Sequence, residues 1–160
     1  MEETTSLEKK KLPGSIGTLT VLTFIGSGIG LITYCMNYFR ADKAVAEMEA
    51  ARDNPDTPAF VKSMMTPEAI EQARLAAANK LPLTILNLIA VALCVAGAIQ
   101  MRKLKKDGYI MWLIGELLPF IATIILIGTG SFTGIPFYVA TGIVALFIIL
   151  YTTQYKYLQK

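Results

Sequence analysis

Hydrophobic residues along the chain fall into four long runs that polar stretches separate. The runs cover residues 15–39, 81–99, 109–127 and 135–153, and together they contain a single charged residue. Each run is long enough to cross a bilayer, because a spanning helix needs about 20 mostly apolar residues. The pattern therefore predicts an all-α protein, an integral membrane four-helix bundle that forms a single domain over residues 1–160.

Residues 40–80 form the only sizeable polar segment between predicted spans, and their composition favours helix. Residues 40–53 are rich in Ala, Glu and Lys, which form helices well, so the first helix is expected to continue beyond the membrane surface. Asn54 and Pro55 are expected to end it, because a residue that precedes proline disfavours the helical conformation. The first and second spans are therefore joined by a helical extramembrane connector.

Two Thr-Pro pairs in the connector predict further helix starts. Thr57–Pro58 and Thr66–Pro67 each offer a capping threonine followed by a proline at the first helical position. Between them, Phe60 and Met64 lie four residues apart and share one face of a short helix. This apolar face is expected to pack on the bundle, on the membrane surface or on a partner protein.

Aromatic residues are expected near the ends of the spans, where Tyr and Trp are enriched at the membrane–water interface. Tyr109 and Trp112 open the third predicted span, and Tyr151 lies near the end of the fourth. We therefore assign these three side chains to an interfacial belt.

The composition narrows the chemistry that the chain supports. Hydrophobic residues make up 54% of it and charged residues 17%, whereas a soluble domain has about 25% charged residues. There is no histidine, and Cys35 and Cys94 do not form a C-x-x-C pair, so the usual zinc, haem and redox motifs are lacking. We expect no metal, no cofactor, no nucleic-acid partner and no enzymatic activity.

The distribution of bases predicts the orientation. Both termini and the turn between the second and third spans lie on one side of the membrane, and together they hold nine bases and four acids. The connector holds six bases and seven acids. The positive-inside rule therefore places both termini in the cytoplasm of a multi-pass inner (plasma) membrane protein.

Glu116 is the one charged residue inside a predicted span. A carboxylate near the bilayer centre costs roughly 2.5–3.5 kcal/mol on insertion scales, so it must be protonated or face a polar partner or water. Thr20 and Thr23 lie at a similar depth on the first span, and Asn87 lies further out on the second. Pro119 lacks an N–H and leaves a carbonyl of its own helix without a partner, which suggests a hinge beside Glu116.

Two further groups of residues are candidate contact sites. Gly26 and Gly30 are four residues apart on the first span, a spacing that lets another helix approach closely. The turn between the second and third spans is strongly basic and is a candidate site for anionic lipid headgroups. Its bases are Arg102, Lys103, Lys105 and Lys106.

One stretch of the chain resembles known proteins. Residues 101–119 (MRKLKKDGYIMWLIGELLP) are similar to a loose group of small, uncharacterised four-span bacterial inner-membrane proteins of the Bacteroidetes type. The resemblance covers about 20 of the 160 residues. It implies a bacterial inner membrane and neither an activity nor catalytic residues.

These patterns leave two functions open. The first is a non-enzymatic accessory or scaffold subunit of a larger membrane complex, in contact with the lipid bilayer and with a partner protein or further copies of itself. The alternative is a small proton- or cation-coupled carrier that uses Glu116. Polar residues are scarce in the spans, and this weighs against a wide pathway for solutes.

Overall fold

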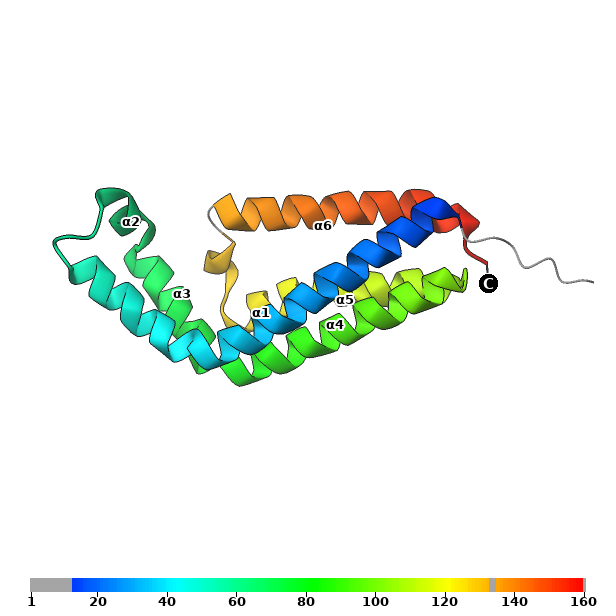
Figure 1. The fold of residues 1–160 in the computed structure, drawn as a ribbon. Helices are drawn as coiled ribbons and strands as arrows, with labels where there is room; N and C mark the ends of the chain where they lie inside the picture. Colours follow the sequence, from blue (N-terminus) through cyan, green and yellow to red (C-terminus); the bar gives the residue numbers. More distant parts are fainter. Residues whose placement is uncertain (1–12, 133–134, 160) are drawn as a thin grey trace, which may run out of the picture.

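The computed structural model describes residues 13–132 and 135–159, and it confirms an all-α membrane protein (Figure 1). Four helices, α1, α4, α5 and α6, are long and apolar enough to cross a membrane. The helices in chain order are α1 (Gly14–Asp53), α2 (Ala59–Met64), α3 (Pro67–Ala78), α4 (Lys80–Arg102), α5 (Lys106–Leu126) and α6 (Ile135–Gln154). Two 3-10 turns, η1 (Thr129–Ser131) and η2 (Tyr155–Tyr157), precede and follow α6.

Helix α1 runs without a break for 40 residues, so the first span continues into the connector as expected. The helix ends at Asp53, where the backbone N–H of Asn54 donates to the carbonyl of Ala50 at 3.1 Å. The predicted stop at Asn54 is therefore confirmed. We call the bundle end that holds Gly14 and Gln159 the termini end, and the opposite end the arm end (Figure 1).

Residues 40–78 form an arm that extends beyond the N-terminal end of α6 (Figure 1). Helix α3 packs back against the second half of α1. An ion pair joins Arg74 of α3 to Glu49 of α1 at 2.6 Å, and Lys80 at the start of α4 pairs with Asp42 of α1. The Glu49 carboxylate also raises the pKa of Arg74. Both pairs are exposed to solvent, so each contributes little to stability.

The two Thr-Pro pairs behave differently. Thr66 caps α3 as predicted, because its Oγ1 accepts a hydrogen bond from the Ala69 N–H at 3.1 Å. The pKa of Glu68 in the same turn is below its usual range, because its carboxylate accepts its own backbone N–H and the Thr66 hydroxyl. Helix α2 begins one residue later than expected, at Ala59, and no side chain caps it.

Helices α4 and α5 form the closest pair in the bundle, and glycines make the approach possible. A Cβ on Gly97 would lie 2.6 Å from the carbonyl oxygen of Gly108, and one on Gly115 would lie 2.8 Å from that of Ala90. The close approach expected at Gly26 and Gly30 is not found: a Cβ on Gly26 meets nothing within 4 Å, and one on Gly30 makes only ordinary contacts. The tight helix interface therefore lies on α4 and α5 and not on α1.

Helix α6 is attached to the bundle mainly at the termini end. Tyr151 hydroxyl and Thr23 Oγ1 are 2.7 Å apart, and Tyr109 hydroxyl and Thr152 Oγ1 are 2.8 Å apart. After η2, the chain pairs with the α4–α5 turn, where the Gln159 N–H donates to the Leu104 carbonyl at 2.6 Å. Towards its middle α6 stands away from the other helices (Figure 1), and this position determines the site described next.

Candidate functional site

A cavity of about 350 Å³ lies between α6 and the other three spanning helices. All four helices contribute to its wall, and Glu116 of α5 is the one charged residue on it. The lining also includes Tyr34 of α1, Cys94 of α4 and Phe147 of α6. Most of the remaining lining is aliphatic, aromatic or glycine.

Helical periodicity explains how these residues come to share one space. On α5, Trp112, Glu116 and Pro119 are spaced by four and three residues, so they lie on one face of the helix. On α1, Thr23 and Gly30 are seven residues apart, which is about two helical turns, so they also share one face along the cavity. Each helix therefore presents one stripe of its surface to the cavity and the rest to its neighbours or to lipid.

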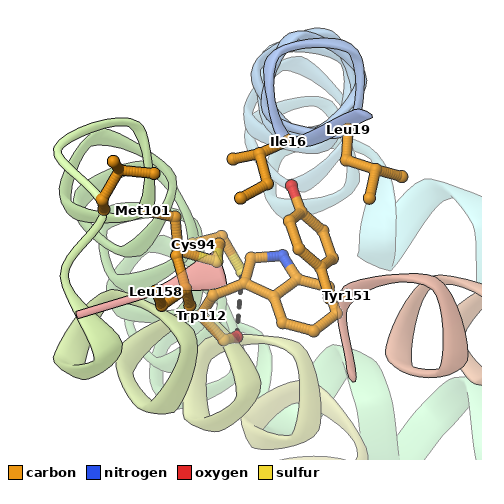
Figure 2. Close-up of a cluster of buried hydrophobic side chains, with 8 residues drawn as sticks. Ile16, Leu19, Cys94, Met101, Trp112, Tyr151 and Leu158 are labelled. Atoms are coloured by element: carbon orange, nitrogen blue, oxygen red, sulfur yellow. Dashed lines mark hydrogen bonds between the residues drawn. The ribbon is translucent and has the colours of Figure 1, made fainter. Parts of the chain in front are cut away.

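The Glu116 carboxyl has one hydrogen-bond partner among the described residues. The Cys94 thiol lies 3.6 Å from Oε2 of Glu116. It also lies 3.8 Å from the backbone carbonyl of Trp112 (Figure 2). A thiol is a weak donor. No Lys or Arg occurs in the four predicted spans, so the spans supply no cation to pair with an ionised Glu116.

The proposed threonine partners of Glu116 are engaged elsewhere. Thr23 lines the cavity, but its hydroxyl is hydrogen-bonded to Tyr151. Thr20 is fully buried and donates to the carbonyls of Ile16 and Gly17, both at 2.9 Å. Neither threonine therefore forms a hydrogen bond with the carboxyl.

Asn87 does not line the Glu116 cavity, and Pro119 does not break its helix. Asn87 lines a second cavity of about 220 Å³ at the arm end, together with Thr84 and Thr123. Pro119 lines the Glu116 cavity, but α5 remains one continuous helix through it, so no break marks the expected hinge. Tyr34 lines both cavities.

A cluster of buried side chains lies next to the cavity, toward the termini end of the bundle (Figure 2). Trp112 and Tyr151 are each 1% exposed, and their ring centroids are 4.3 Å apart. Ile16 and Met101 pack in the same cluster. Trp112 belongs to both the cluster and the cavity wall, and we call it the floor of the cavity.

The interfacial assignment of Trp112 and Tyr151 was therefore wrong. Both side chains turn inward and pack on each other, and only Tyr109 of the three is partly exposed. Sequence position gives the depth of an aromatic residue but not the side of the helix that faces a neighbour. One signal was present, because Trp112 and Glu116 are four residues apart and must share a face.

The basic turn is held in place by the end of the chain. Leu104 is buried, has a positive φ of 59°, and pairs through its carbonyl with Gln159. The bases around it point outward: Arg102, Lys103 and Lys105 are exposed and Lys106 is half-buried. Lys156 lies in η2, next to Tyr155, whose ring centroid is 5.6 Å from the Lys106 Nζ, so it adds to the positive charge near the turn.

Comparison with protein-family models, with characterised proteins and with solved structures finds no match for the chain. Within residues 13–132 and 135–159, no three His, Cys, Asp or Glu side chains are grouped so as to hold a metal ion.

Proposed function

We propose that the protein is a non-enzymatic accessory or scaffold subunit of a larger membrane complex. The arm is the observation that carries this proposal. It is a helical hairpin braced by ion pairs, and it extends beyond the end of α6 (Figure 1). A helical projection outside the membrane supplies contact surface for a partner.

The tip of the arm has the character of a contact surface. Phe60 is 74% exposed and Met64 is 57% exposed, although both are large and apolar. Aromatic residues and methionine are enriched at protein interfaces. The charge distribution supports an arm on the outer side of an inner (plasma) membrane, with both termini cytoplasmic.

Gentle extraction followed by native mass measurement tests this role. Wild-type protein is expected at a mass above the 17.5 kDa of one chain, either as a multiple of it or with a second protein. Phe60→Ser combined with Met64→Ser is expected to shift the mass toward that of one chain, because it removes the apolar contact surface at the tip of the arm. The variant is expected to fold, because both side chains are exposed and contribute little to folding. Lys43→Ala, an exposed change elsewhere on the arm, is the matched control. A wild-type protein that is strictly monomeric and has no co-purifying partner contradicts the proposal.

The Glu116 cavity favours a second candidate, the small proton- or cation-coupled carrier. Its carboxyl lies on the cavity wall, and Tyr34 lines both this cavity and the second cavity at the arm end. A second cavity toward one end of the bundle supports proton exchange between Glu116 and that side of the membrane. The few polar groups around it argue against a hydrated solute.

Proton flux into proteoliposomes, followed by an internal pH dye under an imposed membrane potential, tests the carrier. Wild-type protein is expected to acidify the vesicles, and Glu116→Gln is expected to reduce the flux to that of empty liposomes, because an amide has similar shape but cannot exchange a proton. Equal flux from both proteins, or none from either, rules out this function.

A further inference from the structure

The wall around Glu116 supports an inference that goes beyond the accessory role and does not involve the arm. An ionised carboxylate away from water requires an opposite charge. Its partner among the described residues is the Cys94 thiol, which carries no positive charge. The sequence holds no base between Asp107 and Lys156, nor between Leu81 and Met101, so the chain offers no cation from its spans.

The cavity has the size and lining of a site for a small organic molecule. Ligand sites are usually about 300–1,000 Å³ and mostly apolar with a few polar groups, and this cavity has about 350 Å³. The rings of Tyr34, Trp112 and Phe120 contribute to its wall. Aromatic faces attract cations, so the lining suits a positive charge as well as an apolar body.

The opening of the cavity favours a ligand that dissolves in lipid. Gly26 of α1 and Ala140 of α6 both line the cavity, and both are exposed at the surface of the bundle. Both belong to helices that are long and apolar enough to cross a membrane, so a molecule that enters between them comes from the lipid. A molecule that enters there must carry apolar surface.

We propose that this cavity binds a lipophilic organic monocation, an amine or onium compound whose charge pairs with the Glu116 carboxylate while its apolar body contacts Tyr34, Trp112 and Phe120. Binding needs no transport step. The site can therefore exist in an accessory subunit as well as in a carrier.

Equilibrium dialysis of radiolabelled tetraphenylphosphonium against the purified full-length protein in a neutral detergent tests the site. Wild-type protein is expected to bind one cation per chain saturably. Glu116→Gln is expected to bind at least about tenfold more weakly, because it leaves the cation without a counter-charge. Triphenylphosphine oxide, a neutral molecule with a similar body, is expected to bind wild type and Glu116→Gln equally.

Two glycines on α1 give a matched pair that tests the cavity separately from the charge. A Cβ on Gly26 or on Gly28 meets nothing within 4 Å, but only Gly26 lines the cavity. Gly26→Leu is therefore expected to fill the space and weaken tetraphenylphosphonium binding at least about tenfold. Gly28→Leu is expected to bind as wild type does.

The proposal is overturned if wild type shows no saturable binding, if Glu116→Gln binds as tightly as wild type, or if Gly26→Leu and Gly28→Leu behave alike. Gel filtration and helical circular dichroism of each variant show that it is folded. The native mass of the complex does not depend on cation binding. The binding test can therefore fail while the accessory role stands, and the reverse.

Discussion

Replacing Gly97 by alanine is expected to destabilise the protein, although alanine is the better helix former. In a helix interior alanine is favoured over glycine by about 1 kcal/mol. At Gly97, however, the added Cβ would lie 2.6 Å from the Gly108 carbonyl oxygen and 2.6 Å from the Trp112 backbone nitrogen. Both are backbone atoms that cannot rotate away, so α4 and α5 have to separate. Overpacking of this kind costs about 1–3 kcal/mol, and more where the surroundings cannot yield.

Thermal unfolding of the detergent-solubilised protein measures this effect. Gly28→Ala on α1 and Gly142→Ala on α6 are the matched controls, because a Cβ at either position meets nothing within 4 Å. Both controls are expected to unfold at or slightly above the wild-type temperature, and Gly97→Ala well below it. If all three variants unfold together, the α4–α5 pair does not depend on the missing Cβ.

The sequence predicted the helices well because length and hydropathy decide them locally. The run from Gly14 to Phe39 has no charge, and the Ala- and Glu-rich residues after it favour continued helix, so a single long α1 follows from the order of residues alone. The same holds for the Thr66 cap, which depends on neighbours three residues apart.

The helix interfaces could not be predicted in this way. Gly26 and Gly30 have the spacing of a close-packing pair, but on α1 that face borders the cavity. Gly97, Gly108 and Gly115 do make the close contacts, and their partners lie on another helix, at positions that only the packing reveals. Sequence spacing defines a face, whereas the neighbour of that face depends on the whole bundle.

The candidate site shows the same division. Glu116 was found because a charge inside an apolar run is conspicuous, and Cys94 lies beside it at a similar depth. The cluster next to the cavity was missed, because Trp112 and Tyr151 are at the depth of an interfacial belt and yet pack inward. Tyr34 was missed as a cavity residue for the same reason.

Replacing Trp112 by alanine is expected to have the largest effect among single side chains of the cluster. Trp112 is 1% exposed, packs against Tyr151 and forms part of the cavity wall. Truncation of a buried tryptophan costs about 3–5 kcal/mol, because contacts are lost and a space is left behind. Ile110→Ala on the same helix is the control, since Ile110 is 50% exposed and its truncation leaves no internal space.

Reaction of Cys94 with N-ethylmaleimide shows whether the same change opens the cavity. Cys35 is exposed and is first replaced by serine, so that the buried Cys94 is the remaining thiol. Cys94 lines the cavity, and its thiol lies 3.8 Å from the backbone carbonyl of Trp112 (Figure 2). Trp112→Ala is expected to react faster than the parent protein, and Ile110→Ala at the parent rate. Unfolding at the wild-type temperature together with an unchanged reaction rate is incompatible with Trp112 as the floor, and the boundary of the cavity then has to lie at another residue of the cluster.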